Sequence, residues 1–183
     1  FVFLLLIIFV QQIYSQPKEK QVTWSGSVAK KEIKAGEKAE VKINAAIKEG
    51  WHLYSTTTPP DGAQPTKFSI KESSLFKISG TVSQPKPISK FEEAFGANTE
   101  YFEKEATFRF TVEALNKAKN GENEFTVVVE YMMCNNKFCL PPVEEEIKLK
   151  INVKKDETTV SEQTAKEEQN QDNSALTKGD ITE

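Results

Sequence analysis

The feature that most constrains the fold of this chain is an alternation of apolar and polar residues with a period of two. Such alternation places one face of a β-strand in a core and the other face in solvent. It is clearest in four segments, residues 39–47, 106–112, 125–131 and 147–153. No window keeps the 3.6-residue period of an amphipathic helix, and residues 113–119 allow a helical turn at most. The sequence therefore predicts an all-β protein.

Shorter apolar segments extend this pattern. Further strands are expected at residues 22–28, 51–55, 66–71 and 76–82. Turn-forming pairs separate the strands: Ala35-Gly36, Glu49-Gly50, Pro59 to Gly62, and Asn120-Gly121. Eight or so strands without crossover helices are typical of antiparallel sheets packed face to face, so we expect an antiparallel β-sandwich.

Two connections are long for a sandwich. They span residues 56–65 and 84–101. Long ordered loops on a rigid scaffold often carry function. The second connection contains three aromatic residues and an acidic pair, namely Phe91, Phe95, Tyr101, Glu92 and Glu93. Exposed aromatic rings need a partner, which is either the domain's own surface or another protein.

Both ends of the chain differ from the middle. Residues 1–10 are ten uncharged apolar residues, which is too short for a membrane span and typical of the apolar core of a signal peptide. We expect residues 1–15 to be a signal peptide truncated at its start, with export to a compartment where disulfides form. A buried strand and an uncleaved anchor are the alternatives for this segment.

The other end is polar. Residues 154–183 contain no aromatic residue and carry eight acidic residues against four lysines. Such a segment cannot bury enough apolar surface to order itself. We expect a flexible acidic segment that is either a solvated tail or a linker to a membrane domain beyond this sequence, which leaves residues 16–153 as a single domain.

Charge and histidine content exclude two classes of function. The net charge is −3, so a protein that binds nucleic acid through its phosphates is not expected. The chain has one histidine, His52, which argues against a metal site built from several histidines.

The two cysteines lie in the segment Tyr131 to Pro142, between two predicted strands. Four residues separate Cys134 from Cys139, so a disulfide across a hairpin loop is geometrically feasible. Closing so short a loop stabilises a fold by less than the about 3 kcal/mol of a fifteen-residue loop. The spacing therefore favours an exchangeable redox pair, with a structural hairpin disulfide as the alternative.

Metal binding by the same segment is a weaker alternative. Met132 and Met133 together with Cys134 and Cys139 would be soft ligands for Cu(I). Neighbouring residues of a strand point to opposite faces, however, so the two methionines would not share one site. A zinc site built from the cysteines, His52 and a carboxylate would be an unusual ligand set.

Three motifs resemble one known family. The run EYMMCNNKFCLPP, the earlier GWHLYS and the loop FEEAFGANTEYF are similar to the periplasmic N-terminal domain of the thiol:disulfide interchange protein DsbD. The resemblance covers most of residues 22–153. It implies an immunoglobulin-like fold with a redox-active cysteine pair at one end.

The resemblance also implies roles for individual residues. Cys139 would form the mixed disulfide with partners, and Cys134 would resolve it. His52 and Tyr54 match an aromatic pair that lies beside the disulfide, with His52 standing where an aromatic hydroxyl is common. A histidine there would be able to supply a proton near neutral pH.

The family's cap loop carries an acidic pair followed by aromatic residues that shield the disulfide. Glu92 and Glu93 match the acids. Ala94 replaces the next aromatic residue, so the shielding ring would be Phe95 or Phe91, of which we favour Phe95. Four residues lie between the cysteines here, against five in the best-known members.

The resemblance implies a function in thiol:disulfide exchange, which we state as an expectation. The domain would act as a protein-disulfide reductase in the periplasm, with no cofactor and no metal. A membrane domain and a thioredoxin-like domain would reduce the pair, which would then reduce exported thiol-disulfide proteins. The sequence does not choose among three classes of acceptor, namely disulfide isomerases, cytochrome-maturation thioredoxins and peroxide-reducing proteins. An exported binding sandwich with an inert disulfide is the competing hypothesis.

Overall fold

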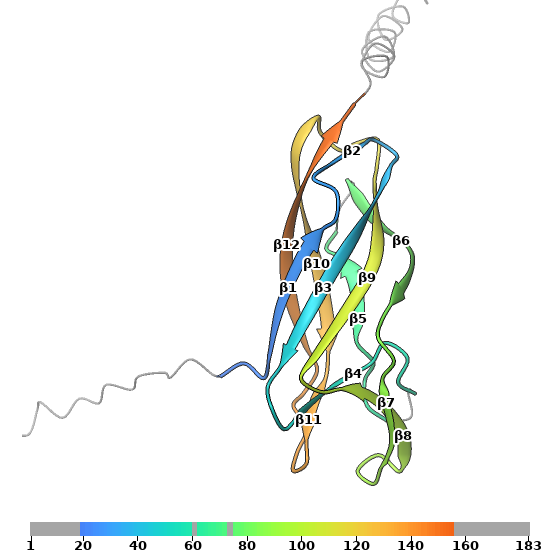
Figure 1. The fold of residues 1–183 in the computed structure, drawn as a ribbon, viewed down its shortest axis with the longest axis vertical. Helices are drawn as coiled ribbons and strands as arrows, with labels where there is room; N and C mark the ends of the chain where they lie inside the picture. The colour runs from blue at the N-terminus through green and yellow to red at the C-terminus, as the bar shows by residue number, and fades with distance from the viewer. Residues whose placement is uncertain (1–18, 60–61, 73–74, 156–183) are drawn as a thin grey trace, which may run out of the picture.

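The computed structural model describes residues 19–59, 62–72 and 75–155, and every regular element in this part of the chain is a β-strand. The strands form three four-stranded sheets. Two of the sheets make up the body of an elongated sandwich, and the third lies at its lower end in Figure 1. The predicted all-β sandwich is confirmed.

The first sheet has the strand order β1-β3-β9-β6 and is antiparallel throughout. Its strands are β1 (Val22–Val28), β3 (Lys38–Ile47), β9 (Glu105–Ala114) and β6 (Phe76–Ser83). Buried and exposed positions alternate along β3 and β9, as the sequence pattern predicts. One face of this sheet therefore supplies half of the core.

The second sheet has the order β2-β12-β10-β5. Its strands are β2 (Glu32–Lys34), β12 (Val143–Lys154), β10 (Gly121–Tyr131) and β5 (Lys67–Ile70). β2 runs parallel to β12, whereas the other pairs are antiparallel. The sequence did not predict β2, because a three-residue strand with one buried side chain is too short to show a period.

Aromatic side chains link the two sheets through the core. Phe108 of β9 is fully buried, and its ring lies 4.9 Å from that of Phe68 on β5 and 6.1 Å from that of Trp24 on β1. Such pairs add about 0.5–1.5 kcal/mol each beyond the area they remove from water. This core is a rigid support for the loops at the end of the sandwich.

The third sheet has the order β11-β4-β8-β7 and is antiparallel. Its strands are β11 (Met133–Asn135), β4 (Trp51–Tyr54), β8 (Ala97–Phe102) and β7 (Ile88–Glu92). β11 follows β10 after a single residue, so the sheet continues directly from the sandwich body. This small sheet brings the cysteine segment and the second long connection together.

The prediction of a long irregular connection at residues 84–101 was wrong. The segment forms the hairpin β7–β8, with Ile88 paired to Tyr101 and Glu92 paired to Ala97. Four of the five residues of β7 are exposed, so this edge strand has no buried face and shows no alternation. Tyr101 is 4% exposed, so of the two partners expected for this ring it has the domain's own surface.

The two predicted end segments lie mostly outside the described residues. Nothing in the structure describes residues 1–15, the predicted signal peptide, or residues 156–183 of the predicted tail. The strand β12 continues to Lys154, one residue into the predicted tail. Within the described ranges, no helix has the length and apolar character needed to cross a membrane.

Candidate functional site

The cysteine pair closes a tight hairpin at the end of the sandwich. The backbone N–H of Asn135 donates to the carbonyl of Phe138 at 3.0 Å. The side-chain oxygen of Asn135 accepts from the backbone N–H groups of Lys137 at 2.8 Å and of Phe138 at 3.0 Å. An asparagine that bonds the next backbone groups favours a turn at this position. The disulfide between Cys134 and Cys139 spans this turn, with the two Cα atoms 4.0 Å apart.

The two sulfur-bearing residues differ in burial. Cys134 is 3% exposed and lies in a small cluster with Tyr54, Ala63 and Tyr101. Cys139 is only partly buried and packs against the edge of that cluster. A reactant from solvent therefore meets Cys139 before Cys134.

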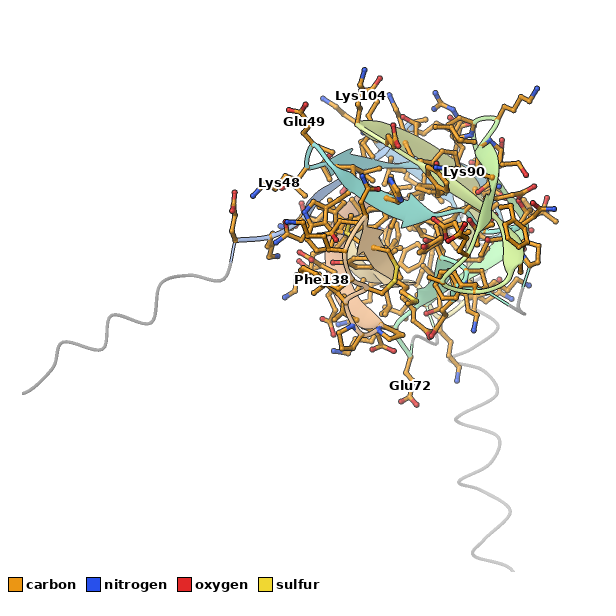
Figure 2. The ribbon with its side chains drawn as sticks, turned by 90° about the horizontal axis from the view of Figure 1, so that it is seen from below. Lys48, Glu49, Glu72, Lys90, Lys104 and Phe138 are labelled. Carbon is orange, nitrogen blue, oxygen red and sulfur yellow. A yellow bond between two sulfur atoms is a disulfide. The ribbon has the colours of Figure 1, made fainter. Side chains whose placement is uncertain are left out.

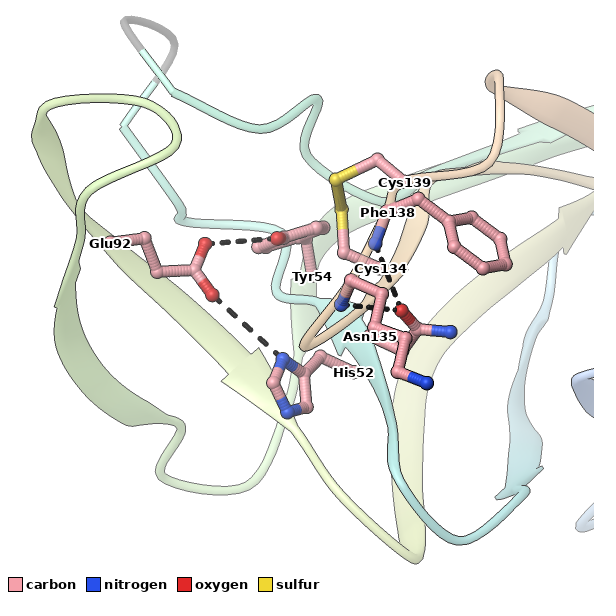
Figure 3. Close-up of a disulfide and its surroundings, with 8 residues drawn as sticks. His52, Tyr54, Glu92, Cys134, Asn135, Phe138 and Cys139 are labelled. Carbon is pink, nitrogen blue, oxygen red and sulfur yellow. Dashed lines mark hydrogen bonds and ion pairs between the residues drawn. A yellow bond between two sulfur atoms is a disulfide. The ribbon is translucent and has the colours of Figure 1, made fainter.

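Strand β4 presents two predicted site residues beside the disulfide. His52 is paired directly with Cys134 across the β11–β4 ladder. Successive residues of a strand point to opposite faces, so His52 and Tyr54 share one face while Leu53 enters the main core. The structure therefore brings both predicted residues to the cysteine pair, as Figure 3 shows.

Glu92, the last residue of β7, joins the cap hairpin to β4. The hydroxyl of Tyr54 donates to its carboxylate at 2.9 Å. The same carboxylate lies 3.8 Å from Nδ1 of His52, and both contacts are drawn in Figure 3. Hydrogen bonds to charged groups are worth about 1.5–3 kcal/mol, so Glu92 is a strong link between the two elements.

A second carboxylate completes the surroundings of His52. Oε1 of Glu103 lies 3.3 Å from Nε2 of the ring. The imidazole stacks on Tyr101, with ring centroids 4.3 Å apart and planes inclined by 18°. The ring is therefore held between two carboxylates and flat against a buried tyrosine.

Two tyrosines near the disulfide resist ionisation. Burial raises the pKa of Tyr54, and the hydrogen bond and charge of Glu92 raise it further. Burial also raises the pKa of Tyr101, with additional effects of the charges of Glu103 and Glu92. Both phenols remain protonated at neutral pH, and the hydroxyl of Tyr54 donates to Glu92.

The turn of the cap hairpin faces the disulfide across one cavity, as Figure 3 shows. The backbone N–H of Gly96 donates to the carbonyl of Glu92 at 2.9 Å, and Gly96 has φ of 64°, a conformation that favours glycine. This turn places Phe95 edge-on to Tyr54, with ring centroids 6.1 Å apart, and against the cysteine cluster. Phe91 is 57% exposed, so Phe95 has the closer packing of the two candidate shields.

All eight predicted site residues line one cavity of about 310 Å³. They are Cys134, Cys139, His52, Tyr54, Glu92, Glu93, Phe91 and Phe95. Glu93 is exposed and accepts a backbone hydrogen bond from Gly96 at 3.2 Å. The sequence analysis missed Glu103 as a partner of His52, because no motif marks a carboxylate that arrives from the end of β8.

Metal-binding residues do not gather here. Within the described ranges there is no group of three or more histidine, cysteine, aspartate or glutamate side chains able to hold a metal ion. Met133 lies in the main core, whereas Met132 packs against the cysteine cluster. The two methionines thus lie on different sides of the chain, as the alternation of side chains predicts. This arrangement argues against a Cu(I) site that uses both of them.

Fold and site together define a class of protein. A β-sandwich carries a half-accessible disulfide at one end, beneath an aromatic and acidic hairpin, as expected for a thiol:disulfide interchange domain. The chain belongs to the family described as thiol:disulfide interchange protein DsbD, N-terminal, whose model matches residues 19–151. The predicted resemblance is confirmed.

One solved structure supports the fold. The N-terminal periplasmic domain of ScsB from Proteus mirabilis matches with a TM-score of 0.53 at 14% identity, over 74% of this chain and 48% of that chain. The chain thus spans about half the length of that structure. BcpA, the major pilin subunit of Bacillus cereus, matches with a TM-score of 0.43 at 11% identity, over 73% of this chain and 40% of that chain. No curated protein sequence matches the chain.

Proposed function

We propose that this domain is a periplasmic thiol:disulfide exchange relay that works as a protein-disulfide reductase through Cys134 and Cys139. It would receive electrons from a thioredoxin-like or membrane-domain donor and pass them to exported thiol-disulfide proteins. The observation that carries the proposal is the disulfide itself, which joins one partly accessible sulfur to one buried sulfur beneath a hairpin. Neither a cofactor nor a metal takes part in this chemistry.

The exchange has two steps. The thiolate of Cys139 attacks the disulfide of an acceptor, so that a mixed disulfide forms and one acceptor thiolate leaves. The thiolate of Cys134 then attacks the sulfur of Cys139, which closes the disulfide and releases the second acceptor thiolate. Two electrons pass to the acceptor, and the two protons released from the cysteines balance those taken up by the acceptor thiolates. The donor reduces the pair by the reverse sequence.

The greater exposure of Cys139 supports its role as the sulfur that meets the partner. The burial of Cys134 at 3% exposure supports its role as the resolving sulfur. An attack on Cys134 would require the partner to displace the surrounding aromatic cluster first, whereas an attack on Cys139 requires only that the cap hairpin move.

The surrounding residues would control access and protons. Phe95 would exclude stray oxidants and thiols while the cap is closed, and Glu92 would hold the cap to β4 through Tyr54. His52, which lies between Glu92 and Glu103, would pass protons between them, and the side chain of Glu103 is 46% exposed. Glu93 adds negative charge at the cavity edge, which favours the protonated thiol.

The roles of the two cysteines are tested by trapping. The variants Cys134→Ser and Cys139→Ser are each reduced and mixed with a thioredoxin that keeps only its accessible cysteine, activated as the mixed disulfide with 5-thio-2-nitrobenzoate, which is the leaving group; the products are resolved without reductant. Cys134→Ser should give a long-lived mixed disulfide, because the resolving thiol is absent, and Cys139→Ser should give none. Equal trapping by both variants would contradict the assignment. No trapping by either would favour an exported binding sandwich with a structural disulfide.

A further inference from the structure

A second hollow borders the cysteine loop on the side away from the cap. It has a volume of about 700 Å³, and we call it the Phe138 groove. Its lining includes Trp51, Tyr131, Phe138, Leu140, Val143 and Glu144. In Figure 3 the ring of Phe138 points away from Glu92 and Tyr54, which line the cap cavity. The two hollows therefore flank the disulfide from opposite sides.

The floor of the Phe138 groove is apolar and open to solvent. Phe138 is 53% exposed and Val143 is 47% exposed. The ring of Phe138 stands edge-on to Trp51, with centroids 5.6 Å apart, so the exposed ring is held in place. Exposed apolar surface that is held in this way is typical of sites that bind a partner.

The groove is continuous with the exchange site. Phe138 directly precedes Cys139, and Leu140 directly follows it, so the partly exposed sulfur lies between two groove residues. Figure 2 views this end of the molecule and shows Phe138 well separated from Lys90 of the cap hairpin. A protein whose cysteine reaches Cys139 past the cap must therefore place its neighbouring residues over the groove.

The rim of the groove is acidic. Three of its glutamates, Glu19, Glu145 and Glu146, pair with Lys48, Lys20 and Lys71 respectively. Glu144 has no ion-pair partner among the described residues and stands opposite Glu130 in the β10–β12 ladder. The carboxylate of Glu130 accepts a hydrogen bond from Gln64, and Lys67 stands opposite Glu130 in the β5–β10 ladder. Glu144 is therefore the carboxylate of this rim that is left for a cation of the partner.

We propose that the Phe138 groove selects the redox partner by binding the segment beside its reacting cysteine. That segment carries a large apolar side chain, which packs on Phe138 and Trp51, and a lysine or arginine, which pairs with Glu144. The inference rests on the proposed function, because the groove can select only a partner that exchanges with Cys139.

The test uses cysteine peptides as probes of the full chain. Three peptides of equal length carry one cysteine next to leucine and lysine, leucine and glutamate, or serine and lysine. The rate at which each reduced peptide opens the Cys134–Cys139 disulfide is measured by thiol trapping. Each rate is divided by the rate of the same peptide with oxidised glutathione, which removes differences in thiol reactivity. Dithiothreitol serves as the small dithiol control.

The normalised rate should be highest for the leucine and lysine peptide. Replacing lysine by glutamate should lower it by about two- to fivefold at low salt, the effect of one exposed ion pair, and less at high salt. Replacing leucine by serine should lower it by about five- to tenfold, as expected for one half-buried apolar side chain. Glu144→Lys should reverse the first preference, and Phe138→Ala should remove the second. Ile88→Ala and Glu49→Lys, which lie outside the groove lining, should preserve both.

Failure of the proposed function and failure of the groove proposal would give different results. If dithiothreitol does not exchange with the disulfide, the proposed function fails. If dithiothreitol exchanges but the peptides show equal normalised rates, only the groove proposal fails. Self-association of the full chain that Phe138→Ala abolishes would assign the groove to a second copy of the chain and overturn the proposal.

Discussion

Removal of the Phe95 ring should expose the disulfide to small thiols. Phe95 is partly buried against the cysteine cluster and stands edge-on to Tyr54 at 6.1 Å. Its contact with Tyr54 is worth about 0.5–1.5 kcal/mol. Half of the burial of a phenylalanine side chain adds about 1 kcal/mol. Phe95→Ala should therefore destabilise the closed cap by about 1.5–2.5 kcal/mol.

The loss of stability of the closed cap determines how much faster the disulfide should be reduced. If reduction requires an open cap and the closed state dominates, the rate is proportional to the open population. A loss of about 1.5–2.5 kcal/mol raises that population roughly ten- to seventyfold, since each 1.36 kcal/mol is a factor of ten. The rise stops once the open state becomes the major one.

The assay is reduction by excess dithiothreitol, stopped by alkylation and read by mass. Phe91→Ala removes a ring that is 57% exposed, so we expect its rate to stay within about twofold of the parent chain. Ile88→Ala, on the exposed strand β7, provides the baseline. The account of the cap is refuted if Phe95→Ala reacts no faster than the parent chain, or if Phe91→Ala accelerates reduction as much.

Three further perturbations test the surroundings of the disulfide and its scaffold. His52→Gln should slow exchange, because the ring that lies beside Glu92 and Glu103 and stacks on Tyr101 is lost; an exchange rate equal to that of the parent chain would assign His52 to packing. Burial, and then Glu92, raises the pKa of Tyr54, so the unfolded state ionises first as pH rises above about 10 and stability falls there. Tyr54→Phe should reduce that alkaline loss by up to about 1.4 kcal/mol per pH unit in denaturant titrations, and an unchanged pH slope would argue against it. Phe108→Ala should lower the free energy of unfolding by about 3–5 kcal/mol, because the fully buried ring contacts both sheets, and a loss below about 1 kcal/mol would contradict the packing described.

The body of the sandwich could be predicted because its strands have one buried face. The segments at residues 39–47, 106–112, 125–131 and 147–153 all lie within observed strands. The strands β2, β7, β8 and β11 could not be predicted in this way. β2 and β11 are three residues long, and β7 has almost no buried side chain. β8 buries two successive residues, Tyr101 and Phe102. None of these strands therefore shows a period of two in its sequence.

The site was predicted through motifs rather than through periodicity. The GWHLYS, FEEAF and CNNKFC motifs contain the eight predicted residues, and the third sheet gathers them around one cavity. The contact of His52 with Glu103 and its stacking on Tyr101 depend on where β8 ends relative to β4. That geometry arises from strand pairing, which no local sequence signal specifies.

The central claim is that Cys134 and Cys139 form an exchangeable pair. The most direct test is the reduction potential of this pair in the full chain, measured by equilibration with glutathione or dithiothreitol and thiol trapping. For an exchangeable pair we expect a value clearly above about −300 mV, because structural disulfides of exported proteins typically fall below that level. A value well below about −300 mV would make the bond a structural staple and contradict the proposed relay.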